Sequence, residues 1–317
     1  MHDGGGGVVD GLGRDLPAPT ILLAHGSSLS GATDWQQAGS DGDGRRCIPP
    51  KRPEVRCEDG GMAAHPTWKR YVAIGDSFTE GIGDPEPKSP GGFRGWADRV
   101  AEVLSARSDD FAYANLAVRG KLMQQIFDDQ LEPALALEPD LITISAGGNN
   151  ILRPGSDPDW VAGRLDEAVA RLRSDGAKVL VFTGPDVGTT PVLGRVRGKA
   201  AIFNENVRAL AGRNGAIVAD MWALRELADP RMWAPDRLHF SAIGHNTIAR
   251  MVLDTLGVEN DLQPFNPEPM PVIPWRQARA EDLTWARTHF APWVGRRLRG
   301  RSSGDHIQPK RPTFGQP

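Results

Sequence analysis

The sequence predicts an α/β fold in which a parallel sheet is covered by helices on both faces. Two observations predict it. Short apolar runs rich in β-branched residues alternate with longer amphipathic stretches between residues 71 and 257. The helix punctuation agrees, since Ser241 is placed to cap the last helix and Gly257 follows its end. The expected strands are 71–75, 112–116, 141–145, 179–183 and 216–218, and the expected helices are 96–106, 123–137, 160–173, 199–213 and 242–256.

Composition narrows the class of protein. A net charge of -3 over 317 residues gives no global attraction for nucleic acid, so we expect no nucleic-acid partner. No apolar run is long enough to span a bilayer, and the run 21–24 is too short for a signal peptide, so we expect a cytoplasmic protein. The only cysteines, Cys47 and Cys57, are interpreted as two free thiols rather than a bridge.

The chain divides into three parts by composition. Residues 1–65 are rich in Gly, Ser, Asp and Pro and are expected to be a disordered extension, within which 25–28 (His-Gly-Ser-Ser) is interpreted as an ordinary loop. Met62 precedes the first ordered pattern, which suggests that translation starts there. Residues 66–258 hold the alternating pattern, and residues 259–317 form a Pro- and Arg-rich extension with a short helix.

The C-terminal extension carries aromatic residues near helical spacing. Trp285, Phe290 and Trp293 lie beside several arginines between residues 296 and 301. One interpretation is a basic amphipathic helix for a membrane surface or an acidic partner. We favour the other, in which the aromatic side chains pack on the domain and the arginines stay solvated, because the apolar face is short.

A serine lies at the carboxyl end of the first expected strand. The apolar run 71–75 ends at Gly75, and Asp76 and Ser77 follow on the turn. In open α/β sheets, ligands bind in the crevice outside the carboxyl ends of the strands. We therefore expect Ser77 to be an exposed nucleophile. Asp76 is expected to bond nearby backbone N–H groups and to hold the turn rather than to act as an acid.

A serine nucleophile needs a base, and the sequence offers one before the last helix. His239 should lie at the same edge of the sheet, and Asp236 is close enough to accept a hydrogen bond from its Nδ1. The chain order Ser, Asp, His is that of the α/β-hydrolases. The nucleophile elbow of those enzymes is missing, however, because Thr79 stands where its second glycine belongs.

Three groups could stabilise the oxyanion of a tetrahedral intermediate. They are the backbone N–H of Ser77, the N–H of Gly120 after the second strand, and the side-chain amide of Asn149 after the third. Each of the three follows a different strand, and the base comes from a fourth loop. The pattern therefore predicts acyl-transfer chemistry at one edge of the sheet.

These residues resemble the four blocks of the SGNH (GDSL-type) hydrolase family. The resemblance covers residues 71–257 and implies a flavodoxin-like three-layer αβα sandwich with a five-stranded parallel sheet, and esterase or lipase activity. Two departures are visible: Asn150 replaces the usual aspartate of the third block, and Phe78 replaces a leucine. We expect the first to alter loop hydrogen bonds only. The blocks read 75–77 (Gly-Asp-Ser), Gly120, 147–150 (Gly-Gly-Asn-Asn) and 236–239 (Asp-Arg-Leu-His).

Other residues near the blocks have more ordinary interpretations. His245 is interpreted as a packed or capping histidine, and no spacing of His, Cys or carboxylates indicates a zinc site. The loop 184–198, with Arg195 and Arg197, is expected to overhang the site, either contacting an acyl or anionic group or lying solvated. Substrate-binding residues are not identified by the sequence.

The sequence thus predicts a serine esterase with Ser77, Asp236 and His239 as a catalytic triad and no cofactor. Its partner is a small-molecule ester, and its oligomeric state is left open. Two alternatives remain: an acyltransferase that uses the same site with an alcohol in place of water, and a non-catalytic binding module that retains the fold. The intact set of three residues argues against the second.

Overall fold

The computed structural model describes residues 67–317, apart from 189, 191–192, 272 and 300. The described residues belong to one compact unit that extends to Pro317. The expected N-terminal extension, with Cys47, Cys57 and the 25–28 motif, lies outside the described residues.

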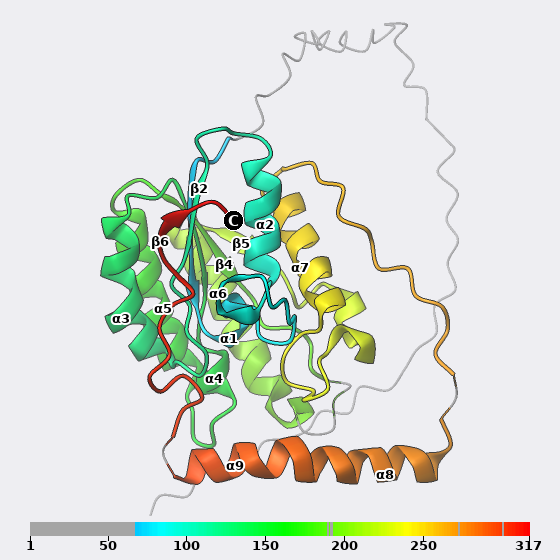
Figure 1. Cartoon of the computed structure of the whole chain (residues 1–317). Coiled ribbons are helices and arrows are strands. Elements are labelled where there is room, and N and C mark those ends of the chain that lie inside the picture. The colour runs from blue at the N-terminus through cyan, green and yellow to red at the C-terminus, as the bar shows by residue number, and fades with distance from the viewer. Residues whose placement is uncertain (1–66, 189, 191–192, 272, 300) are drawn as a thin grey trace, which may run out of the picture. The chain divides into compact units, whose positions relative to one another are not determined.

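A six-stranded sheet forms the centre of this unit, and its first five strands are parallel (Figure 1). The expected α/β fold is therefore confirmed. The strand order, β5-β4-β3-β1-β2-β6, places β1 between β2 and β3, so the loops after these three strands are neighbours. The strands are β1 (Arg70–Gly75), β2 (Ala112–Asn115), β3 (Leu141–Ser145), β4 (Lys178–Phe182), β5 (Ile217–Ala219) and β6 (Arg311–Gly315).

Helices cover both faces of the sheet. Alternate side chains of β1 point to opposite faces, so Val72 and Ile74 join one core while Tyr71 and Ala73 join the other. Helices α3, α5 and α6 pack on the first core and α2 and α7 on the second. The main helices are α2 (Trp96–Ser105), α3 (Met123–Ala136), α5 (Pro158–Arg173), α6 (Arg197–Asn214) and α7 (Ala242–Thr255), and two single-turn helices, α1 (Ser77–Glu80) and α4 (Gly148–Ile151), follow β1 and β3.

Local signals fix the ends of these elements. The Ser241 hydroxyl accepts a hydrogen bond from the Gly244 N–H at 3.3 Å, as expected of an N-cap. Gly257 follows α7 with φ of +69°, a conformation that glycine adopts without strain. All five expected strands and all five expected helices are present, with ends that differ from the expected ones by at most two residues. None of the helices in the described parts of 67–317 is both long and apolar enough to cross a membrane.

The C-terminal extension is more structured than the sequence indicates. We call residues 275–315 the C-terminal arm. It holds α8 (Trp275–Trp285), a π-helical turn (Ala286–Phe290), α9 (Ala291–Leu298) and finally β6, which pairs antiparallel with β2. The sheet therefore has six strands rather than the expected five. The last strand was not predicted because its sequence, Arg-Pro-Thr-Phe-Gly, lacks an alternating apolar pattern.

A buried ion pair anchors the end of the arm. Lys310 Nζ lies 2.5 Å from Asp98 Oδ2 on α2, with only 2% and 4% of the two side chains exposed. The same amine donates to the Phe93 carbonyl at 3.0 Å, and Arg311 Nε lies 3.7 Å from Asp98 Oδ1. Burial lowers the pKa of Lys310, and the charge of Asp98 partly restores it. The pair therefore fastens the start of β6 to the second helix of the domain.

We predict that Lys310→Met lowers the free energy of unfolding by about 3 kcal/mol, because it leaves the buried Asp98 carboxylate with Arg311 as its remaining charged partner. Urea denaturation measures the change. The matched control is Lys69→Met, whose pair with Asp110 is 54% and 80% exposed and should contribute less than about 1 kcal/mol. Equal losses in the two variants would contradict the anchoring role of Lys310.

Candidate active site

The backbone around Ser77 is held by buried polar side chains. Gly75 donates its N–H to Gln130 Oε1 at 2.8 Å and accepts from Gln130 Nε2 at 2.9 Å, so one amide on α3 pairs with both backbone groups at the end of β1. Asp76 then caps α1, because its Oδ1 accepts the Phe78 N–H at 3.1 Å. Ser77 is the first residue of α1 and is partly exposed. The expected turn-holding role of Asp76 is confirmed.

Asp236 and His239 contact each other as the sequence suggests. His239 Nδ1 lies 2.6 Å from Asp236 Oδ2, while Asp236 Oδ1 accepts the backbone N–H groups of Leu238 and His239, each at 3.0 Å. Burial raises the pKa of Asp236, but these hydrogen bonds and the charge of His239 outweigh it and hold the pKa at about 2. The carboxylate therefore stays ionised and places the Nδ1 proton of His239 toward itself, leaving Nε2 free.

The loops that carry Ser77 and His239 pack against each other through their neighbours. The rings of Phe78 and Phe240 are 5.5 Å apart, edge to face. A Cβ on Gly83 would lie 2.0 Å from the Phe240 carbonyl oxygen, so only glycine allows this approach. No hydrogen bond joins Ser77 Oγ to His239 Nε2 among the described residues. Such bonds often form only when substrate binds.

The loop that carries Gly120 is tied to α1 by a buried ion pair. Arg119 donates its backbone N–H to Glu80 Oε2 at 2.7 Å and its Nε to Glu80 Oε1 at 2.9 Å. The Glu80 side chain is 4% exposed. Gly120 follows with φ of +75°, in the left-handed region. Neither Gly120 N–H nor Ser77 N–H donates to any acceptor within the described residues.

The Asn149 amide links the third block to the other two. Its Nδ2 donates to Asp76 Oδ2 at 3.0 Å and to the Lys121 carbonyl oxygen at 3.1 Å. These two bonds use both amide protons. Asn150, the departure from the family pattern, accepts the Met123 N–H at 2.9 Å through Oδ1. An aspartate would accept the same bond, so the change alters little.

Two further titratable groups near Ser77 have strongly shifted pKa values. Burial raises the pKa of Asp76 to about 6, and its hydrogen bonds and the nearby His239 limit the rise. Burial lowers the pKa of His245 to about 3. His245 Nδ1 accepts the Trp96 N–H at 3.1 Å, and Nε2 lies 3.2 Å from the Ile82 carbonyl oxygen. His245 is therefore a neutral, packed capping residue, as expected.

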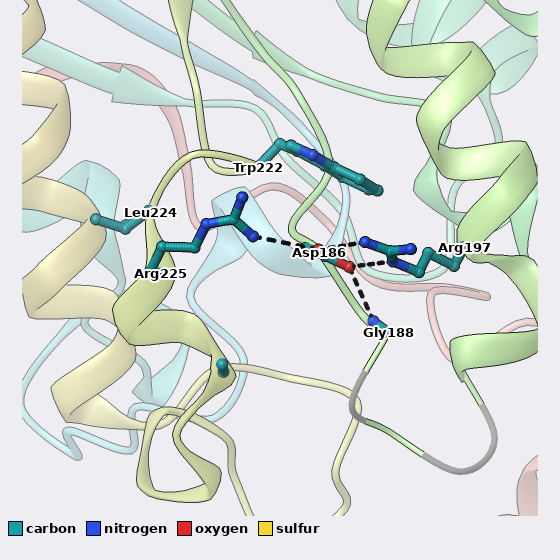
Figure 2. Close-up of a pocket in the computed structure, with 7 residues that line it drawn as sticks. Asp186, Gly188, Arg197, Trp222, Leu224 and Arg225 are labelled. Atoms are coloured by element: carbon teal, nitrogen blue, oxygen red, sulfur yellow. Dashed lines mark hydrogen bonds and ion pairs between the residues drawn. The ribbon is translucent and has the colours of Figure 1, made fainter. Parts of the chain in front are cut away.

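The loop after β4 contributes a cavity of about 260 Å³ (Figure 2). Arg197 and Arg225 approach Asp186 from opposite sides, with nitrogen–oxygen distances of 2.7 and 3.3 Å. The hydrogen bond from Arg197 is the main reason that the pKa of Asp186 falls to about 2. Because Arg197 is paired with Asp186 and its guanidinium also lies 5.4 Å from the Trp222 ring, its charge is largely satisfied within the protein.

Some residues that build this site were not identified from the sequence. Gln130 is one of several polar residues of α3 and Glu80 lies in the turn after β1, and no spacing marks them as partners of Gly75 and Arg119. Within the described residues, no group of three or more His, Cys, Asp or Glu side chains could hold a metal ion.

The sequence model of the GDSL-like lipase/acylhydrolase family matches residues 73–247, more than half of the chain. The chain belongs to this family. The resemblance of the four blocks to SGNH hydrolases is therefore confirmed, and the protein is a member of a hydrolase family. No curated protein matches the chain.

Solved structures resemble this hydrolase in fold. LAE5, an α/β hydrolase enzyme from the metagenome of Lake Arreo, Spain, is 21% identical, with a TM-score of 0.52 over 61% of this chain and 97% of its own. A mutant form of Axe2, an acetyl-xylooligosaccharide esterase from Geobacillus, is 20% identical, with a TM-score of 0.50 over 60% of this chain and 95% of its own. At these identities the likeness concerns the fold.

We predict that Asp76→Asn changes how stability depends on pH. The pKa of Asp76 in the folded protein, about 6, lies above the ordinary value of 3.8, so its contribution to the free energy of unfolding is complete below pH 4 and is lost as pH rises through 6. The variant lacks this loss. Urea denaturation at pH 4 and pH 7.5 should show the variant gaining on the order of 3 kcal/mol relative to wild type. If the free energy of unfolding changed with pH in the same way in wild type and variant, the raised pKa of Asp76 would be contradicted.

Proposed function

We propose that the protein is a serine esterase that cleaves carboxylic esters through an acyl-enzyme, with Ser77, Asp236 and His239 as its triad. The 2.6 Å contact between His239 Nδ1 and Asp236 Oδ2 carries this proposal. It fixes the tautomer in which Nε2 is an acceptor, which a general base requires. The family's hydrolase character and the packing of Phe78 on Phe240 support it.

The proposed reaction uses the four blocks in two half-reactions. His239 Nε2 accepts the proton of Ser77 as Oγ attacks the ester carbonyl, and Asp236 stabilises the imidazolium that forms. The tetrahedral intermediate collapses, and His239 returns the proton to the leaving alcohol. Water then attacks the acyl-serine with His239 again as base, and the acid is released. Asp76 is bonded to Phe78 and Asn149 and takes no part in proton transfer.

The oxyanion in this proposal accepts from the N–H groups of Ser77 and Gly120 and from Asn149 Nδ2. The two backbone donors are unpaired in the described structure. Asn149 already donates to Asp76 and Lys121, so the oxyanion must replace or share one of these bonds. The bond to the neutral carbonyl of Lys121 is the weaker one, and we propose that it is exchanged.

We predict that Ser77→Ala and His239→Ala each reduce kcat by several powers of ten on p-nitrophenyl esters. A fluorophosphonate probe should label the wild type and fail to label Ser77→Ala. Labelling without hydrolysis of any ester would favour the acyltransferase alternative. An unlabelled wild type that hydrolyses nothing would contradict the proposal.

Asn149→Ala is expected to lower kcat by roughly two to three powers of ten, because it removes one donor to the oxyanion. Asn150→Ala is the matched control, since the adjacent amide bonds the start of α3 instead of Asp76. Thermal melts of both variants separate catalysis from stability. A wild-type kcat in Asn149→Ala would refute the oxyanion assignment.

A further inference from the structure

The C-terminal arm is attached to two of the loops that build the proposed site. At one point, Trp285 Nε1 donates to the carbonyl oxygen of Asp236, the proposed triad acid, at 2.9 Å. At the other, the arm lies against Gly120 so closely that a Cβ there would be 2.3 Å from Ser302 Oγ. The arm therefore extends from the triad loop to the loop proposed to hold the oxyanion. Figure 1 shows α8 and α9 running along the end of the domain at which α4 lies.

The first attachment also involves the side chain next to Asp236. Arg237, between Asp236 and Leu238, forms an ion pair with Asp282 of α8 at 2.6 Å, and its guanidinium lies 5.2 Å from the centre of the Trp285 ring. Arg237 has φ of +55°, a strained conformation for a residue with a long side chain.

At the second attachment, Gly304 is buried, and a Cβ on it would lie 1.9 Å from the Arg119 carbonyl oxygen. Two backbones thus meet there without a side chain between them.

Three aromatic rings line the face of the arm between these attachments. Trp285 and Phe290 stack at 5.6 Å between centroids, and Phe290 and Trp293 stack at 6.0 Å. We call them the aromatic row. Trp285 and Phe290 are five residues apart, a spacing that would place them on different faces of an α-helix. The π-helical turn 286–290 brings them onto one face.

The aromatic row begins at the triad loop and belongs to neither core. Its first ring donates to the Asp236 carbonyl, and the other two rings stack on it in succession. All three are half-buried, and neither of the two described hydrophobic cores includes them. From residue 285 to 293 the row extends about 12 Å along the helix. Ligand sites are lined mainly by apolar and aromatic side chains with a few polar groups, and the row supplies apolar rings next to the loop that carries Asp236.

We propose that the aromatic row binds the apolar acyl chain of the ester, which makes the enzyme selective for esters with extended acyl groups. The proposal rests on the esterase function above and adds the substrate class. A membrane surface fits these rings less well, because the first ring is bonded to the triad loop and all three are partly buried, while Arg287, Arg296 and Arg299 of the same arm are exposed.

The test measures kcat/KM on p-nitrophenyl esters from acetyl to decanoyl for wild type, Phe290→Ala and Trp293→Ala. The decanoyl value should fall about tenfold to a hundredfold in both variants, and the acetyl value should stay within about twofold. Trp275→Ala is the matched control, because this tryptophan is on the same arm but 69% exposed, and it should change neither value. An equal change at every chain length, or no change, would overturn the proposal.

Binding to Ser77→Ala separates this inference from the esterase proposal. Calorimetry should detect decanoate binding to Ser77→Ala and a loss of about tenfold in affinity on adding Phe290→Ala, whether or not the wild type hydrolyses esters. Decanoate affinity unaffected by Phe290→Ala would overturn the inference even if the esterase activity is real. Binding of anionic phosphatidylglycerol vesicles that is lost in Phe290→Ala, with acyl selectivity unchanged, would overturn it in favour of a membrane surface.

Discussion

The buried carboxylate of Asp76 is the interaction on which the arrangement of the site depends. One oxygen caps the helix that begins with Ser77, and the other accepts from Asn149, so a single side chain joins the first block to the third. The same amide of Asn149 bonds the backbone of Lys121, which extends the link to the second block. With 7% of the residue exposed, water competes little for these bonds. The price is a carboxyl group whose pKa is raised toward neutrality.

The fold and the four blocks could be predicted because both depend on local signals. Parallel strands such as Leu141–Ser145 are continuous apolar runs, and their carboxyl ends meet at one edge whatever lies between them. Asp236 and His239 are three residues apart, so their contact depends on one turn only. Partners distant in sequence left no such signal. Gln130 pairs with Gly75 across 55 residues, and the sequence contains nothing that distinguishes it from other polar residues of an amphipathic helix.

The contacts of the C-terminal arm also join residues that are distant in sequence, and they too could not be predicted. The arm's aromatic spacing was visible, and Trp285 bonds directly to the domain by donating to the Asp236 carbonyl oxygen. The sequence did not show where the arm joins the domain, because Lys310 and Asp98 are 212 residues apart and β6 lacks the alternating apolar pattern of a strand. A buried ion pair specifies this pairing more by the cost of leaving either charge alone than by its own attraction. Lys310 directly precedes β6, so the pair holds the start of that strand next to the domain.

On the two proposals above, catalysis and substrate choice depend on different parts of the chain. The proposed reacting groups follow strands β1, β2 and β3 or precede α7, where the sheet itself sets their separation. The aromatic row comes from a segment that the family match, residues 73–247, does not include. A segment outside the shared domain can change without disturbing Asp236 or Gly120, provided that its two attachments survive. Selectivity could therefore diverge in the arm while the chemistry stays with the sheet. On this argument the arm, more than the fold, should distinguish this hydrolase from others that share its four blocks.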